Sequence, residues 1–283
     1  MDFIIYCQGL YKNYRKKKVL QGIDLAVPKG SVFALLGTNG AGKTTLIRTL
    51  LGLIPASAGT VKVLGAEPYK IGPTLRQNIG YVSEEQGLYG WMTVGGLIRF
   101  CKALYQNWDE QLVQKYLVRF KLDLNTKIST LSKGQTTKLA LILALAPQPE
   151  LLILDEPMNG LDPLAQYEFL QVIKNDLSSE SRSVFFSTHN LNDVELIAEQ
   201  VAILFNGKIQ ISGTITEICQ QLVKVKIANG QNIQCRQLVL EETADHRVIL
   251  IPAAAAEQLQ ITVGPALPVT LHEAFLFYCS GGE

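Results

Sequence analysis

The sequence has almost no excess charge, few cysteines and no long hydrophobic run. Its 283 residues carry 26 Lys and Arg against 25 Asp and Glu, so no global basic field points to nucleic acid. The five cysteines are odd in number and at least 16 residues apart, which excludes closely spaced metal-ligand pairs and indicates reduced thiols. The apolar stretch 139–146 is far shorter than the ~20 residues of a membrane helix. Residues 1–6 lack a secretory pattern, so we expect a cytoplasmic chain that does not itself cross a bilayer.

What the sequence does contain is short apolar runs separated by helical patterns. Continuous runs of three to five apolar residues are typical of strands buried on both faces of a parallel sheet, and they occur at 32–36, 79–82, 151–154, 184–186 and 201–205. Between the runs, apolar residues recur at helical spacing in 43–53, 133–146 and 164–177. Strands that alternate with helices predict an α/β domain with a central sheet.

Residues 85–130 differ from this pattern. They contain two helical stretches, about 94–106 and 109–121, and no strand-like run. Both tryptophans, Trp91 and Trp108, occur here. We therefore predict a helical insert in the α/β core.

The pattern of apolar and polar residues changes again in the last 70 residues. Apolar residues alternate with lysines at 222–227, and Asn229-Gly230 favours a turn that could open a hairpin. Thr270 and Glu273 have the spacing of a capping box before an apolar run, which predicts a final helix. We expect a main domain and a small appended βα domain, with boundaries at 1–213 and 214–283.

A glycine-rich segment predicts a nucleotide phosphate site. Residues 37–44, GTNGAGKT, fit the pattern G-x-x-x-x-G-K-[ST] at every fixed position, between a predicted strand and a helix. Glycines let successive backbone N–H groups converge on phosphate oxygens, Lys43 would neutralise the β- and γ-phosphates, and the Thr44 hydroxyl would coordinate Mg²⁺. The predicted nucleotide contacts are Gly37, Asn39, Gly40, Ala41, Gly42, Lys43, Thr44 and Thr45.

Two adjacent carboxylates are candidates for binding Mg²⁺ and activating water at this site. Four apolar residues at 151–154 end in Asp155 and Glu156, at the sheet edge where ligands bind in α/β proteins. Asp155 would hold a Mg²⁺-bound water, and Glu156 would orient or deprotonate the water that attacks the γ-phosphate. ATP and Mg²⁺ are the expected cofactors.

A third group of motifs resembles the ATP-binding cassette (ABC) ATPases. Residues 131–135, LSKGQ, resemble the family's signature sequence Leu-Ser-Gly-Gly-Gln. Asn159-Gly160-Leu161-Asp162 resembles the D-loop, and Ser187-Thr188-His189 resembles the switch-histidine motif. Tyr14 stands where the family carries an aromatic residue that stacks on adenine, with Tyr11 as the competitor. The resemblance covers about residues 1–213.

The resemblance implies a fold and a mechanism. The fold is a P-loop NTPase with a RecA-like core, an N-terminal antiparallel β subdomain and a helical signature subdomain. The mechanism is an ATP sandwich in a dimer, in which the signature motif of one subunit caps the γ-phosphate bound by its partner. The residues implied are Glu156, His189 and Lys43 for catalysis, and Ser132, Gly134, Gln135 and Asp162 for the partner's nucleotide.

Two positions depart from the common family pattern. Glu84 stands where the family usually has a glutamine that contacts Mg²⁺, and Gln86 is a possible substitute. Lys133 replaces the first signature glycine and would add positive charge beside the phosphates.

The segments 79–89 and 270–277 resemble exporter ATPases of the drug and antibiotic type, whose membrane subunits are separate chains. The resemblance thus implies separate transmembrane partners, with Tyr89 and Trp91 as candidate docking residues, and a place on the inner face of the plasma membrane. An importer ATPase, a soluble ABC protein acting on nucleic acid or ribosomes, and a regulatory module without turnover are the alternatives.

Overall fold

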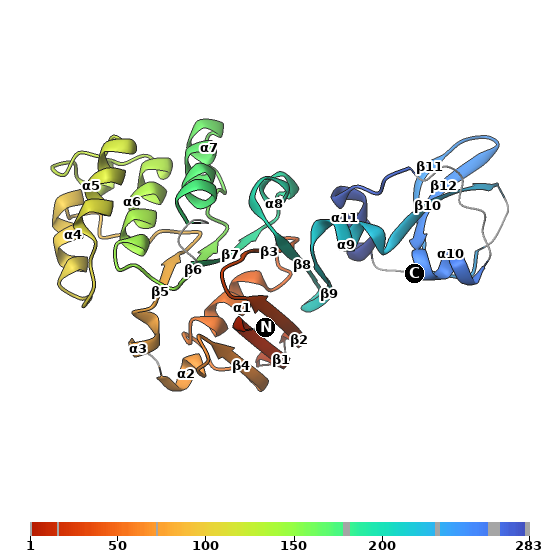
Figure 1. The fold of residues 1–283 in the computed structure, drawn as a ribbon, viewed down its shortest axis with the longest axis horizontal. Coiled ribbons are helices and arrows are strands. Elements are labelled where there is room, and N and C mark those ends of the chain that lie inside the picture. The colour runs from red at the N-terminus through yellow and green to blue at the C-terminus, as the bar shows by residue number, and fades with distance from the viewer. Residues whose placement is uncertain are drawn as a thin grey trace.

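A six-stranded sheet forms the centre of the computed structural model, which describes residues 2–15, 17–71, 73–177, 182–229, 233–259 and 267–280. Its strands are β3 (Val32–Gly37), β5 (Ile79–Val82), β6 (Leu151–Asp155), β7 (Ser183–Thr188), β8 (Gln200–Phe205) and β9 (Lys208–Gly213). The strand order is β5-β6-β7-β3-β8-β9, and all neighbours are parallel except the β8–β9 pair (Figure 1). All five predicted apolar runs are strands of this sheet, which confirms the predicted α/β architecture.

Both faces of the central sheet are buried. Phe33 belongs to one apolar cluster and Ala34 to another, and Ile153 and Leu152 divide in the same way. Successive side chains of a strand point to opposite faces, so a sheet with two apolar clusters needs strands that are apolar at every position.

An N-terminal antiparallel sheet covers one side of this core, as predicted. It consists of β1 (Phe3–Tyr14), β2 (Lys17–Pro28) and β4 (Ala58–Val63), in the order β2-β1-β4. Buried residues of β1 and β2, such as Leu10 and Ile23, pack in the same cluster as Leu46 of helix α1 (Lys43–Leu50). Two short helices follow, α2 (Pro68–Ile71) and α3 (Pro73–Arg76).

The predicted helices of the insert are present but shorter. They are α4 (Val94–Lys102) and α5 (Glu110–Arg119), followed by the short 3-10 helix η1 (Ile128–Thr130) and by α6 (Lys133–Leu145). Thr93 and Asp109 cap α4 and α5, because their side chains accept hydrogen bonds from the N–H groups of Gly96 and Leu112. The three α-helices lie together at one end of the molecule (Figure 1).

Helices after β6 and β7 complete the central region. They are α7 (Pro163–Gln171), which continues into the π-helical segment η2 (Val172–Leu177), and α8 (Leu191–Ile197). Within the described ranges, no helix combines the length and the apolar character needed to span a membrane.

The C-terminal part carries a separate three-stranded sheet. Its elements are α9 (Ile215–Gln220), β10 (Leu222–Ala228), β11 (Leu238–Glu242), β12 (His246–Pro252), α10 (Ala253–Gln258) and α11 (Leu271–Cys279). The predicted hairpin at Asn229-Gly230 is wrong, because the strand order is β10-β12-β11 and β10 pairs with β12. Residues 249–251 of β12 are fully buried, whereas β11 ends in exposed glutamates, so the more apolar strand takes the central position. Gly230 itself lies outside the described residues.

The final helix returns to the main core. Thr270 and Glu273 form the predicted capping box at its start. Leu271, Ala274 and Phe277 of α11 pack in the same cluster as residues of β8. This helix therefore ties the C-terminal part to the central sheet.

Candidate functional site

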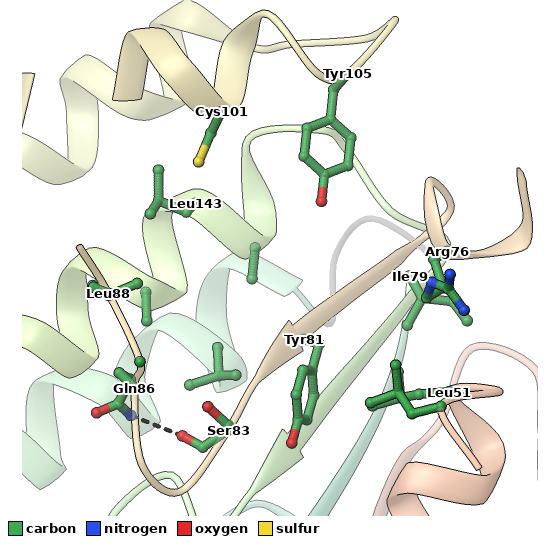
Figure 2. A pocket seen from close by; sticks show the side chains of 15 residues that line it. Leu51, Arg76, Ile79, Tyr81, Ser83, Gln86, Leu88, Cys101, Tyr105 and Leu143 are labelled. Atoms are coloured by element: carbon green, nitrogen blue, oxygen red, sulfur yellow. Dashed lines mark hydrogen bonds between the residues drawn. The ribbon is translucent and has the colours of Figure 1, made fainter. Parts of the chain in front are cut away.

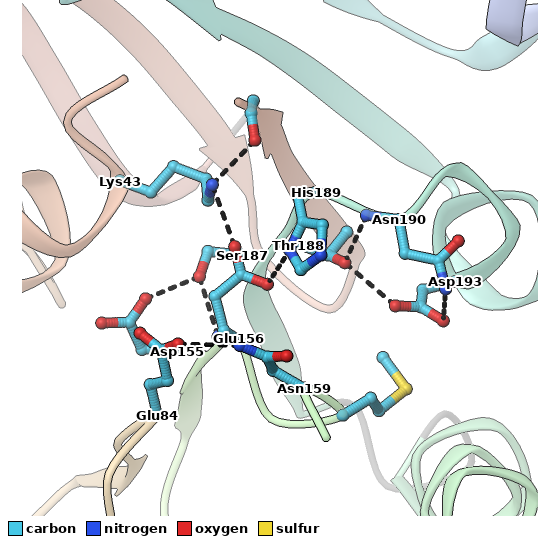
Figure 3. A network of polar contacts seen from close by, with 12 residues as sticks. Lys43, Glu84, Asp155, Glu156, Asn159, Ser187, Thr188, His189, Asn190 and Asp193 are labelled. Carbon is cyan, nitrogen blue, oxygen red and sulfur yellow. Dashed lines mark hydrogen bonds and ion pairs between the residues drawn. The ribbon is translucent and has the colours of Figure 1, made fainter. Parts of the chain in front are cut away.

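The predicted site residues converge on one edge of the central sheet. β6, β7 and β3 are parallel neighbours, so their carboxyl ends bring the phosphate loop, the two carboxylates and the histidine motif together. One polar network joins Lys43, Glu156 and His189 (Figure 3). Glu84, on the loop after β5, lies beside this network and contacts Asn159.

The phosphate loop has a backbone that glycine permits. Gly40 and Gly42 have φ of 80° and 113°, in the left-handed region. A Cβ on Gly37 would lie 2.5 Å from the carbonyl oxygen of Leu204, so no side chain fits there. A Cβ on Gly40 would meet no heavy atom within 4 Å, so the loop is open at this position. The first N–H groups of α1 have no partner within the helix and are available for an anion.

A cavity of about 390 Å³ lies over this loop. It is lined by Lys17, Val19, Asn39, Gly40, Gly42, Lys43, Thr44, Thr45, Glu84 and Glu156. The ammonium and hydroxyl groups and the open backbone fit a polyphosphate. Of the predicted loop contacts, Gly37 and Ala41 do not line the cavity. The carbonyl of Ala41 accepts a hydrogen bond from Gly207 N–H, in the turn between β8 and β9, at 3.1 Å.

Lys43 and Glu156 form a buried ion pair. Nζ of Lys43 lies 2.9 Å from Oε1 of Glu156, and the side chains are 6% and 7% exposed. The same ammonium donates to the carbonyl oxygens of Gly37 at 2.7 Å and Thr38 at 3.2 Å. These contacts hold the lysine head group at the cavity wall.

Glu156 has a left-handed backbone, with φ of 47°, a conformation that is rare for residues other than glycine and common at functional sites. Ser187 holds this conformation. Its hydroxyl oxygen accepts the N–H of Glu156 at 3.0 Å and its hydroxyl donates to Oδ1 of Asp155 at 2.7 Å. Ser187 is fully buried, so one hydroxyl holds both the carboxylate of Asp155 and the backbone of Glu156.

Asp155 is the residue best placed to bind a cation with Thr44. Burial raises the pKa of Asp155 above its ordinary value, and the nearby carboxylates of Glu156 and Glu84 add to the rise. Hydrogen bonds with the hydroxyls of Ser187 and Thr44 oppose it. A carboxylate and a hydroxyl in contact beside a polyphosphate cavity are hard oxygen donors of the kind that Mg²⁺ prefers.

His189 completes the network. Its Nδ1 lies 2.8 Å from Oε2 of Glu156, and 42% of its side chain is exposed. One oxygen of Glu156 therefore contacts Lys43 and the other contacts His189.

Glu84 and Gln86 lie in different places. Glu84 lines the phosphate cavity, and its Oε1 accepts a hydrogen bond from Nδ2 of Asn159 at 2.9 Å. Gln86 donates to the carbonyl oxygen of Ser83 at 2.9 Å and lines a second cavity, below α4 and α6 (Figure 2). Of the two candidates, only Glu84 is at the phosphate site.

Tyr14 lies at the margin of the cavity. Its register partner on β2 is Lys17, which lines the cavity. The tyrosine side chain is 43% exposed, and Nζ of Lys12 lies 5.1 Å from the centre of its ring. Its predicted adenine contact stays a prediction.

The signature residues stand apart from the cavity of their own chain. Ser132 and Gln135 form a capping box at the start of α6, in which each side chain accepts the other's backbone N–H, while Gly134 follows on the same turn. Asp162 caps α7 by accepting the N–H of Ala165 at 2.9 Å. A Cβ on Gly160 would lie 2.7 Å from Nζ of Lys133, so this lysine lies against the D-loop.

Sequence reasoning assigned no separate role to Ser187, Asn159 or Asp193. Ser187 and Asn159 contact the carboxylates of the site, and buried Asp193 lies beside the histidine motif. Ser187 stands within a recognised motif, which is the one signal that could have pointed to it.

Comparisons with known proteins agree with this geometry. Residues 20–159 match the family described as ABC transporter. The ABC transporter ATP-binding protein YtrB of Bacillus subtilis is 28% identical over 96% of this chain and 97% of its own length. The uncharacterized ABC transporter ATP-binding protein MJ1023 of Methanocaldococcus jannaschii is 31% identical over 92% of this chain and 94% of its own length. The bacitracin transport ATP-binding protein BcrA of Enterococcus faecalis is 32% identical over 77% and 71%.

Solved structures show the same fold. The ATP-binding subunit of an ABC transporter superposes with a TM-score of 0.71 at 30% identity, covering 77% of this chain and 92% of that one. The ATP-binding cassette MJ0796, in a dimeric post-hydrolysis state, superposes with a TM-score of 0.67 at 20% identity, covering 74% and 98%. The predicted P-loop NTPase fold of ABC type is confirmed. This chain therefore belongs to the ABC transporter family, as an ATP-binding subunit whose ATP hydrolysis is coupled to transport.

Proposed function

We propose that this chain is the ATPase subunit of an exporter and acts as a dimer on two separate transmembrane subunits, from the cytoplasmic face of the plasma membrane. The observation that carries the proposal is the placement of Glu156 between Lys43 and His189 beside the phosphate cavity. The similarity to BcrA, a bacitracin transport ATP-binding protein, supports a transporter of the antibiotic type, and the resemblance of segments 79–89 and 270–277 to exporter ATPases supports export.

In this proposal Glu156 is the general base. It accepts a proton from the water that attacks the terminal phosphate of ATP. A triphosphate in the cavity competes with Glu156 for the ammonium of Lys43, because both are anions and the lysine is already at the cavity wall. His189 keeps its contact with the other carboxylate oxygen, so the freed oxygen faces the water.

Mg²⁺ fits the donors at the same edge. Thr44 and Asp155 would hold it, with Glu84 as the third oxygen donor lining this site. When bound, the cation neutralises charge on the phosphates. Ser187 donates to Asp155 and keeps the carboxylate oriented.

Ser132, Gly134, Gln135 and Asp162 serve the nucleotide of the partner subunit in this proposal, and Tyr14 stacks on adenine. The capped start of α6 supports this role, since helix N-termini favour anions. ATP then links the two subunits, and its hydrolysis removes the link.

The transmembrane subunit docks in the second cavity. This cavity of about 380 Å³ lies between β5, the loop at 83–88, α4 and α6, with apolar walls that include Leu88 and Leu143 (Figure 2). Tyr89 and Trp91 follow the lining residue Leu88 in the chain and are 49% and 76% exposed, with ring centres 6.1 Å apart. Exposed aromatic pairs of this kind anchor interfaces.

We also propose the division of the chain at residues 213/214, with the helical insert at about 85–130 in the first part. The three-stranded sheet β10-β12-β11 has its own apolar cluster, which supports an accessory domain at 214–283. Helix α11 would attach this domain to the ATPase.

Purification from native membranes tests the proposal. The full chain should co-purify with two hydrophobic subunits, and ATP should drive substrate into inside-out vesicles that contain the complex. Recovery with ribosomes or DNA would instead support a soluble ABC ATPase. Transport out of such vesicles would support an importer.

A further inference from the structure

Asp193 is a buried carboxylate that the chemistry above does not use. It lies on the first turn of α8 and is 5% exposed. A buried carboxylate destabilises the fold unless its oxygens accept hydrogen bonds. Oδ2 of Asp193 accepts the Thr188 hydroxyl at 2.9 Å, and Oδ1 accepts Nδ2 of Asn190 at 3.2 Å (Figure 3).

These two partners flank His189 in the chain. Thr188 is the last residue of β7, and Asn190 immediately precedes α8. The hydroxyl oxygen of Thr188 also accepts the backbone N–H of Asn190, at 3.0 Å. Asp193, Thr188 and Asn190 thus form a closed ring of hydrogen bonds across the position of the histidine.

The backbone sets the position of the His189 side chain. It lies in the two-residue connection between β7 and α8, and 42% of its side chain is exposed. Its Nδ1 is nevertheless 2.8 Å from Oε2 of Glu156. Few side chains surround the half-exposed ring. The short contact with the buried carboxylate therefore requires that the backbone hold the Cα of His189 in a fixed position.

Asp193 is not needed as the N-cap of α8. Oδ1 of Asn190 accepts the N–H of Asn192 at 3.1 Å, so Asn190 caps α8. Burial raises the pKa of Asp193, and the nearby Glu156 carboxylate adds to the rise, while the Thr188 hydrogen bond lowers it. The fold thus keeps a carboxylate where a neutral side chain would be easier to bury.

We propose that Asp193 is a positioning residue that, through Thr188 and Asn190, holds His189 against Glu156. This inference rests on the proposed role of His189 in ATP hydrolysis. Asp193 itself touches neither nucleotide nor water in the reaction, and its effect on the rate passes through the histidine.

A double-mutant cycle on the full-length chain tests this. Asp193→Ala should lower kcat for ATP hydrolysis about tenfold and change KM for ATP less than about twofold, because nucleotide binding uses other residues. In the His189→Ala background the same substitution should change kcat less than about twofold. An equal loss of kcat in both backgrounds, or wild-type kcat in Asp193→Ala, would overturn the inference while leaving the role of His189 intact. Wild-type kcat in His189→Ala would instead overturn the proposed role of the histidine, and the inference with it.

Two further variants separate positioning from a folding defect. Asp193→Asn keeps the shape and the acceptor for Thr188, and should retain more kcat than Asp193→Ala. Asn192→Ala removes an exposed side chain from the same turn and should leave kcat unchanged.

Ring nitrogen signals give a readout independent of turnover. The chain has only three histidines, His189, His246 and His272. In protein labelled with ¹⁵N-histidine, both Asp193 variants should shift the signals of His189 and leave the other two unchanged. Unshifted His189 signals in Asp193→Ala would contradict the inference.

Discussion

The ammonium of Lys43 lies 2.9 Å from a carboxylate oxygen of Glu156, and both side chains are almost fully buried. The residue that is to bind the phosphates and the residue that is to activate the water are thus partners of one ion pair. A buried charge that loses its partner is strongly destabilising. Changes at either residue should therefore affect folding stability as well as catalysis.

Lys43→Met should lower the free energy of unfolding of nucleotide-free protein by about 3 kcal/mol, because it leaves the Glu156 carboxylate buried without its cation. The double variant Lys43→Met/Glu156→Gln should recover more than half of this loss, since a neutral amide replaces the unpaired charge. Urea denaturation measures both values. Wild-type stability in the single variant would show that the ion pair contributes nothing.

Glu156→Gln should bind ATP with near wild-type affinity but hydrolyse it at least about 100-fold more slowly, because the general base is lost while the phosphate contacts remain. With Mg-ATP it should elute as a dimer in size-exclusion chromatography. Glu150→Gln is the matched control. Glu150 immediately precedes β6, the strand that Glu156 follows, and its side chain is 54% exposed. Hydrolysis at the wild-type rate would show that Glu156 is misassigned.

Trp91→Ala should reduce transport by the reconstituted complex by at least about tenfold, because truncating an aromatic anchor at an interface commonly costs 2 kcal/mol or more. Basal ATP hydrolysis by the isolated chain should be unchanged, since Trp91 lies outside the phosphate cavity. Val118→Ala on α5 is the control, because Val118 is 79% exposed and does not line the second cavity. Unimpaired transport in Trp91→Ala would remove this residue from the interface.

Cys7 on β1 should make folding stability fall at high pH. Burial, with a smaller contribution from Asp24, raises the pKa of this thiol from 9.0 to about 12. Between these values the unfolded chain loses the proton and the folded chain keeps it, so stability decreases as the pH rises, by up to about 1.4 kcal/mol per pH unit. At about pH 8 and below, the thiol is protonated in almost all molecules of both states and has almost no effect.

Cys7→Val isolates this contribution from other groups that titrate at high pH. The stability of the wild type relative to this variant should be constant from pH 7 to 8.5 and should fall between pH 9 and 11. Urea denaturation at each pH measures the difference. A difference that stays constant up to pH 11 would mean that the thiol ionises equally in both states.

Local patterns were enough to predict much of this protein. The phosphate loop, the five buried strands and the capped helix after Thr270 depend on residues that are close in the chain. Glycine φ angles, continuous apolar runs and helix caps act over a few residues, so the amino-acid sequence alone determines them.

Tertiary structure decided what depends on distant residues. The sequence favoured Glu84 over Gln86 for the Mg²⁺ position but left Gln86 as a substitute. The structure places Glu84 at the phosphate cavity, where it contacts Asn159, and places Gln86 in a different cavity. β10 pairs with β12 rather than with β11, the next strand in the chain, and β12, which has no exposed side chain, takes the central position of this sheet. The contact of His189 with Glu156, and the hydrogen bonds of the Ser187 hydroxyl with the Asp155 carboxylate and the Glu156 N–H, exist only once β6 and β7 lie side by side. Hydrogen-bond partners are chosen by distance in space, and the order of residues along a chain does not contain that distance.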